Sequence, residues 1–342
     1  MNKNPVFITG VYRSGTTILS RMLDAHPDMN IAYDSINYFR WYLKTNTPPK
    51  DYKKIVHEVG DRLLNRYNKK IDCIKIINNI SKYGKIITHK QIYSSIMDDY
   101  MGYEEKRWGE KTVLEWTSIP KFFNMFSGGK ALHIIRDPRD VVSSYKNMTF
   151  ESKDRYFDSI FACMHSMDTA IEYKKKLPKS KYYIVHYEEL VKNPKCELIK
   201  ICKFLEIKYD HEMVNPDKYI DNQGGKLTLE TQSSYIDGVD KLPIGRWRDK
   251  LDSTEVAFIE GFLFDNMRVF GYKPSKSSLE LNKIIKIIKN ESLLIDRVVN
   301  YLKGGGGIEE YPSDPKDPKN WTAIGESGLS AGSRFVRNDK YK

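Results

Sequence analysis

The chain has 342 residues, of which 40% are hydrophobic and 30% are charged, and its formal net charge at pH 7 is +11. This length and composition allow one large α/β domain or two small ones, and one core is the simpler interpretation. The four cysteines show neither a CxxC pair nor metal-ligand spacing, which excludes a predicted disulfide framework or zinc site. The positive charge favours an anionic partner on the surface without saying which one.

The N-terminal sequence enters an apolar run at once, and no apolar stretch reaches the roughly 18 residues that a membrane helix needs. We therefore expect no signal peptide, no membrane span and a cytoplasmic protein. No aromatic-interleaved basic patch or known motif supports nucleic-acid binding.

The first elements form a βαβ unit. Val6–Thr9 is a short apolar run that ends at Gly10, and Thr17–Leu23 then shows helical spacing. After the turn signal of 26–28, Asn30–Tyr33 is predicted as a second strand. These segments predict a strand, a tight turn, a helix and a parallel strand.

The region 36–107 is predicted to be a helical insertion that covers the sheet and forms much of the acceptor-binding region. It contains several helical patterns and one segment, Lys85–Thr88, that is ambiguous between strand and loop. It also carries 15 Lys and Arg against 8 Asp and Glu. That excess fits either a binding track for an anionic acceptor or ordinary solvated helix faces.

Further strands are expected at Trp108–Lys111, Ala131–Ile135 and Tyr182–Val185, and helical patterns follow the last two. After the last strand, helices are expected at Glu188–Leu205 (split by Pro194), Ser253–Phe270 and Leu279–Leu302. This alternation predicts an α/β fold with a P-loop-like parallel sheet flanked by helices. We expect one domain over residues 1–303, followed by a Gly-rich linker and flexible tail over 304–342.

The segment from Gly10 to Thr17, GVYRSGTT, has the GxxxxG frame of a phosphate-binding loop between a strand and a helix. Backbone N–H groups and the helix dipole favour a phosphate at such a turn. Thr16 occupies the position at which a nucleotide triphosphatase has its lysine, and Arg13 supplies a cation inside the loop instead. The substitution argues against ATP or GTP with magnesium as the ligand.

A second anion site is indicated by HIIRDPRD, at residues 133–140. Arg136 follows a buried strand, while Asp137 and Pro138 fit the N-cap and first position of a helix. Ser144 lies two turns into that helix and faces the same crevice. From the residues alone, a purely structural role fits as well as an anion site: Arg136 could form a salt bridge with Asp140, and Ser144 could be an ordinary helix serine.

These segments resemble the PAPS-dependent sulfotransferases, in which PAPS is 3′-phosphoadenosine 5′-phosphosulfate. VFITGVYRSGTTILSRMLDAHPDM is similar to their 5′-phosphosulfate loop, nearest the branch with the protein-tyrosine sulfotransferases and bacterial enzymes, and IIRDPRDVVSS resembles their 3′-phosphate site. YEELV with Pro194 and the GRWR of 245–248 also match in order. The region 36–107 and the tail match nothing in this pattern.

The resemblance implies the cofactor-binding residues. The 5′-phosphate is expected at Ser14, Gly15, Thr16 and Thr17, with Arg13 facing the bridging oxygen. Arg136 and Ser144 are expected at the 3′-phosphate, and further contacts are expected from Tyr187 and Arg246.

Candidate catalytic residues follow from the same resemblance. Arg13 and Lys111 are the cations near the leaving group, Lys111 only after a one-residue gap, and Ser233 is a weaker candidate for stabilising the transferring group. Asp34 stands where the tyrosyl-protein branch has a catalytic glutamate, so it is either the base or a helix cap. His89 and His57 are alternative bases.

We therefore expect a PAPS-dependent sulfotransferase that moves a sulfuryl group to a hydroxyl or amine and leaves adenosine 3′,5′-bisphosphate. The expected acceptor is a small molecule or glycan, and the basic character of the insertion would permit an anionic one. The transfer needs no metal. The alternatives are a P-loop nucleotide kinase or NTPase, and a basic binding protein that keeps an inactive nucleotide fold.

Overall fold

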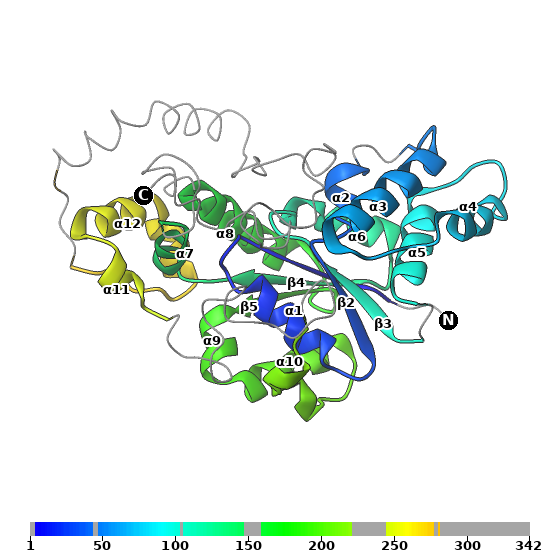
Figure 1. The fold of residues 1–342 in the computed structure, drawn as a ribbon. Coiled ribbons are helices and arrows are strands. Elements are labelled where there is room, and N and C mark those ends of the chain that lie inside the picture. Colours follow the sequence, from blue (N-terminus) through cyan, green and yellow to red (C-terminus); the bar gives the residue numbers. More distant parts are fainter. Residues whose placement is uncertain are drawn as a thin grey trace.

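A computed structural model describes residues 4–43, 47–102, 105–146, 159–220, 244–276 and 280. At its centre is a parallel sheet with the spatial order β2-β3-β1-β4-β5 (Figure 1). The strands are β1 (Val6–Gly10), β2 (Met29–Tyr33), β3 (Arg107–Lys111), β4 (Lys130–Ile135) and β5 (Tyr182–His186). Every strand predicted from the sequence is confirmed, and the ambiguous segment Lys85–Thr88 is loop.

The two faces of the sheet belong to two hydrophobic clusters, because side chains alternate along each strand. On β1, Phe7 joins one cluster while Val6 and Ile8 join the other; on β4, Ile135 and Leu132 divide in the same way. Figure 1 shows α1, α9 and α10 on one side of the sheet, and α6, α8 and the insertion helices on the other. The predicted α/β layering is thereby confirmed.

One face is covered by helices that directly follow strands: α1 (Thr16–Asp24), α9 (Tyr187–Lys192) and α10 (Pro194–Leu205). Pro194 lies at the start of α10, since proline lacks the N–H that a helix interior uses, and this confirms the predicted split. The short 3₁₀ segments η3 (His211–Val214) and η4 (Pro216–Lys218) follow on the same part of the chain.

The opposite face is covered by η1 (Trp116–Ser118), α6 (Ile119–Met125) and α8 (Ser159–Lys176), with α7 (Pro138–Lys146), α11 (Trp247–Lys250) and α12 (Ser253–Val269) beside them. Helix α12 packs on both α7 and α8, and α11 packs on α7. The helix predicted at Ser253–Phe270 is thus confirmed. The one predicted at Leu279–Leu302 and the tail of 304–342 lie outside the described residues.

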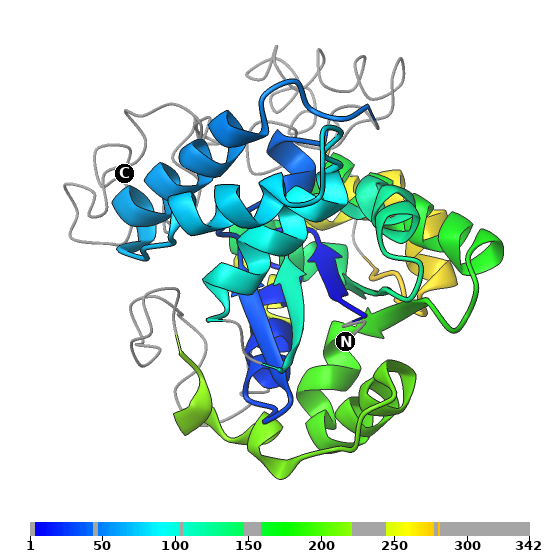
Figure 2. The same cartoon turned by 90° about the vertical axis from the view of Figure 1, so that its right-hand side faces the viewer.

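The insertion forms α2 (Tyr38–Trp41), α3 (Tyr52–Tyr67), α4 (Cys73–Ser81) and α5 (His89–Tyr100), which confirms its predicted helical character. Asp51 and Asp72 cap α3 and α4, and Thr88 forms a capping box with Gln91 at α5. Figure 2 shows these blue and cyan helices gathered on one side of the sheet. None of the helices in the described part of the chain combines the length and apolar composition of a membrane span.

Candidate active site at the carboxyl edge of the sheet

The turn after β1 is wound tightly and leaves the start of α1 open. The N–H and hydroxyl of Ser14 both donate to the Val11 carbonyl, at 3.1 and 2.6 Å, and Arg13 and Gly15 adopt positive φ angles of 67° and 97°. A Cβ on Gly15 would lie 2.2 Å from the Tyr187 ring, so this position requires glycine. No side chain caps α1 at Gly15. The first N–H groups of α1 therefore face the turn and can donate hydrogen bonds to an anion. The N–H of Ser14 cannot, because it already donates to the Val11 carbonyl.

Four predicted cofactor contacts from separate parts of the chain meet beside this turn. Arg13 Nε donates to Ser144 Oγ at 2.8 Å, and an Arg136 Nη donates to the Arg13 carbonyl at 2.7 Å. The Arg136 guanidinium lies 4.3 Å from the centre of the Tyr187 ring. Two arginines and a serine hydroxyl thus converge next to the N-terminus of α1.

The turn that carries Arg136 is fixed by buried carboxylates. Asp137 Oδ1 accepts the Arg139 N–H at 2.9 Å, which confirms the predicted cap of α7, and the Asp137 N–H donates to Glu188 Oε1 at 2.8 Å. The other Glu188 oxygen accepts the Tyr272 hydroxyl at 2.9 Å. Burial raises the pKa of Glu188. No sequence pattern predicts this role of Tyr272, because nothing local connects it to the turn.

Arg246 lies on a segment that is anchored to α7. The two carboxylate oxygens of Asp140 accept the N–H groups of Gly245 and Trp247, at 2.7 and 3.0 Å, and burial raises the pKa of Asp140. Trp247 in turn stacks under the guanidinium of Arg139, 4.2 Å from the ring centre. Arg246 therefore sits next to the helix that carries Ser144.

Asp34 and Lys111 lie together at the ends of β2 and β3. These strands pair in register Tyr33 to Lys111, and the Asp34 N–H extends the pairing by donating to the Lys111 carbonyl at 2.9 Å. Lys111 Nζ forms an ion pair with Asp34 Oδ2. Among the described residues, Asp34 Oδ1 makes no hydrogen bond although it is shielded from solvent. Asp34 is not the cap of a following helix, because α2 has Asn37 at that position.

The remaining catalytic candidates are placed differently. Both nitrogens of His89 have partners inside the insertion, the Tyr38 hydroxyl at 2.9 Å and the Thr47 carbonyl at 3.1 Å, and burial lowers the pKa of its imidazole. His57 is exposed on α3. Ser233 lies outside the described residues.

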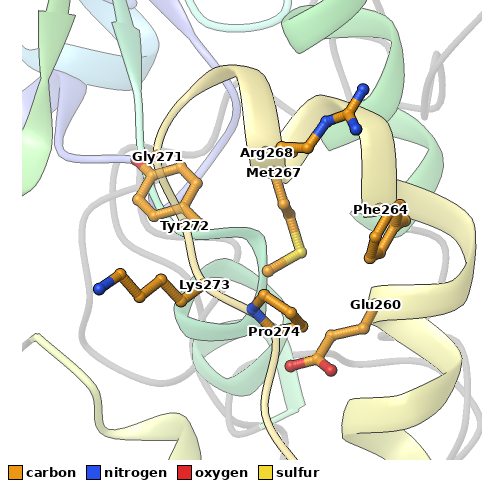
Figure 3. Close-up of a pocket in the computed structure, with 8 residues that line it drawn as sticks. All are labelled: Glu260, Phe264, Met267, Arg268, Gly271, Tyr272, Lys273 and Pro274. Atoms are coloured by element: carbon orange, nitrogen blue, oxygen red, sulfur yellow. The ribbon is translucent and has the colours of Figure 1, made fainter.

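A cavity of about 260 Å³ lies elsewhere, at the end of α12 (Figure 3). None of the candidate site residues lines it. Two of its lining residues, Glu260 and Tyr272, bind Arg139 and Glu188, so the cavity lies behind the turn that carries Arg136. It does not mark the site suggested by the sequence.

The fold and this edge define the class of protein: a P-loop-like parallel α/β protein whose first helix begins, without a side-chain cap, directly after the turn that follows β1. Solved structures with the same fold include the sulfotransferase domain of the Synechococcus PCC 7002 olefin synthase (TM-score 0.56, 18% identity, 79% of this chain and 96% of that one). The sulfotransferase domain from the curacin biosynthetic pathway is similar (TM-score 0.55, 16% identity, 79% and 98%).

Sequence comparison identifies the family. A model described as "Sulfotransferase family" matches residues 5–211, which is more than half of the chain, and the chain belongs to this family. It is 23% identical over 298 residues to the protein-tyrosine sulfotransferase A of Caenorhabditis elegans, with 84% of this chain and 72% of that protein covered. It is 24% identical over 286 residues to the Drosophila melanogaster protein-tyrosine sulfotransferase, with 79% and 52% covered. The protein is therefore an enzyme of the sulfotransferase class.

Proposed function

We propose that this enzyme transfers the sulfuryl group of PAPS to the hydroxyl of a tyrosine in a protein or peptide. Membership of the sulfotransferase family supports the reaction type, and the names of the relatives support the acceptor. This acceptor differs from the small molecule or glycan expected from the sequence. The excess of positive charge on the insertion, which permitted an anionic acceptor, does not by itself distinguish between them.

The residues at the sheet edge fit a nucleotide with two separate phosphates. The open N-terminus of α1, with the hydroxyls of Thr16 and Thr17, suits the 5′-phosphosulfate end. Arg136 and Ser144 would hold the 3′-phosphate, because the planar guanidinium meets phosphate oxygens bidentately. When bound, PAPS supplies an activated sulfuryl group, and adenosine 3′,5′-bisphosphate is left.

The observation that carries the proposal is the state of the Asp34 carboxylate. Lys111 holds one oxygen, and the other is shielded and has no donor among the described residues. A carboxylate with one oxygen left without a donor can accept the proton that a tyrosine hydroxyl loses as its oxygen bonds to sulfur. Lys111 holds this carboxylate in place through the ion pair, and Arg13 would stabilise the negative charge that grows on the departing phosphate.

The donor is tested by thermal shift. Adenosine 3′,5′-bisphosphate is expected to raise the melting temperature and Mg-ATP is not, because Thr16 replaces the lysine that reaches the outer phosphates. Stabilisation by Mg-ATP alone would instead support the kinase alternative.

The base and the acceptor are tested with labelled PAPS and synthetic tyrosine peptides. Asp34→Asn is expected to lower kcat about 100-fold or more while the Kd of adenosine 3′,5′-bisphosphate stays within about twofold. Asp61→Asn, an exposed change on α3, is the matched control. A wild-type rate in Asp34→Asn would place the base elsewhere, and transfer only to small phenols or glycans would refute the acceptor.

A further inference from the structure

The backbone around Asp34 is held in an unfavourable conformation by contacts from distant elements. Asp34 and Asn37 have positive φ angles of 44° and 49°, which non-glycine residues seldom adopt. The Asp34 carbonyl accepts two hydrogen bonds, from Asn37 Nδ2 at 2.7 Å and from the Tyr67 hydroxyl at 2.9 Å. Such a turn persists only when its surroundings determine it.

The centre of those surroundings is Glu110, the residue before Lys111 on β3. Its side chain is fully buried, and Oε1 accepts the backbone N–H of Asn37 at 2.6 Å. Oε2 accepts the hydroxyl of Tyr93 from α5. Because side chains alternate along a strand, Glu110 and Lys111 contact the 34–37 turn from opposite faces of the sheet, at Asn37 and Asp34 respectively.

Arg62 of α3 completes the support. It is 1% exposed, and it donates to the carbonyls of Ser35, at 3.2 Å, and Ile36. Polar side chains of the insertion or of β3 thus bind four backbone groups of the turn: the Asn37 N–H and the carbonyls of Asp34, Ser35 and Ile36. An unpaired buried group at any of these points would cost free energy, which makes the set mutually dependent.

We propose that Glu110 and Arg62 are positioning residues that fix the direction of the Asp34 carboxylate through the backbone of residues 34–37. The proposal rests on the role of Asp34 as the base. Neither residue touches the substrates; both act through the turn. The insertion therefore contributes to the rate of transfer as well as to the acceptor surface.

The first test is a double-mutant cycle with the labelled tyrosine-peptide assay. Glu110→Ala is expected to lower kcat about 10- to 100-fold, since a displaced catalytic group loses rate steeply, with the Kd of adenosine 3′,5′-bisphosphate within about twofold. Glu110→Gln keeps an oxygen for the Asn37 N–H and should stay within about threefold of wild type. In an Asp34→Asn background, Glu110→Ala should lower kcat by less than about a further threefold, because both substitutions remove the same function.

Two milder variants guard against misfolding of Glu110→Ala. Tyr67→Phe and Asn37→Gly each remove one hydrogen bond to the Asp34 carbonyl, and glycine accepts the positive φ at 37. Each is expected to lower kcat about 3- to 10-fold. Tyr183→Phe is the matched control. It removes the hydroxyl that Tyr183 of β5 donates to Glu197 of α10, and it should leave kcat unchanged.

Hydrogen exchange of peptides covering residues 33–42 separates this proposal from the assignment of the base. Faster exchange in Glu110→Ala but not in Glu110→Gln or Tyr183→Phe is expected whether or not Asp34 is the base. Unchanged exchange in Glu110→Ala, wild-type kcat in both Tyr67→Phe and Asn37→Gly, or fully additive losses with Asp34→Asn would each overturn the proposal.

Discussion

The two halves of the sheet edge are built by different means. On the nucleotide side, which we define as the 10–17 turn with Arg136, Ser144 and Tyr187, each residue directly follows its own strand or lies on the helix that begins there. On the insertion side, comprising Asp34, Lys111 and Glu110 with α2–α5, the turn is held by side chains 26 to 77 residues away in sequence.

From this difference we expect nucleotide binding and the rate of transfer to be controlled by different parts of the edge. Local backbone features shape the two turns of the nucleotide side: a glycine at positive φ, an uncapped helix and an Asp N-cap. The direction of one carboxylate, in contrast, depends on a buried polar network. Variants on the nucleotide side should therefore change affinity, and variants on the insertion side should change kcat.

The largest expected effect is on the nucleotide side. Arg136→Ala and Arg13→Ala should each lower kcat/KM for PAPS about 100-fold or more, and Arg136→Ala should weaken adenosine 3′,5′-bisphosphate about 10- to 100-fold, because charge-assisted contacts to phosphate are lost. Steady-state kinetics and isothermal titration calorimetry measure the two effects. Arg268→Ala, a mostly exposed arginine on α12, is the control. Wild-type turnover in both site variants would remove the assignment of this side.

A smaller effect is expected at the anchor of Arg246. Asp140→Ala leaves the N–H groups of Gly245 and Trp247 without their acceptor, so the segment should loosen and KM for PAPS should rise about tenfold. Cleavage by trypsin after Arg246 or Arg248 should become faster. Asp140→Asn keeps one oxygen acceptor, so its KM for PAPS and its cleavage rate should lie between those of wild type and Asp140→Ala. If cleavage and KM both stay at wild-type values, the anchor does not hold this segment.

The smallest effect is expected in the pH dependence of stability on the insertion side. Burial raises the pKa of Glu110 from 4.5 to about 7. Between these values the folded protein keeps a proton that the unfolded chain has lost, so this group makes the free energy of unfolding fall as pH rises through the window. Relative to Glu110→Gln, wild type should lose stability from about pH 4.5 to about pH 7 and change no further above it. Urea unfolding across this range measures the difference, and parallel curves would contradict a buried titrating Glu110.

Much of the fold was visible in the sequence because short buried strands alternate with helices, and the split at Pro194 follows from the chemistry of proline. The structure also brings together Arg13, Arg136, Ser144 and Tyr187, four residues that the resemblance had named. Glu110 lies in a predicted strand but was not predicted as a site residue, because a glutamate before Lys111 carries no sign that it is buried. Tyr272 and Arg62 were missed for the same reason.

The strand, turn and helix that begin the chain could be predicted from the sequence, because glycine, proline and capping residues act on the few residues beside them. The order of strands and helices along the chain was also predictable, since hydrophobic periodicity is local, whereas the order of the strands in the sheet was not. Only the tertiary structure decided that Lys111 pairs with Asp34, and that Glu110, Arg62 and Tyr67 hold the turn between them. Those contacts join residues far apart in the chain, and burial gives them their strength only once the helices of the insertion have packed on the sheet.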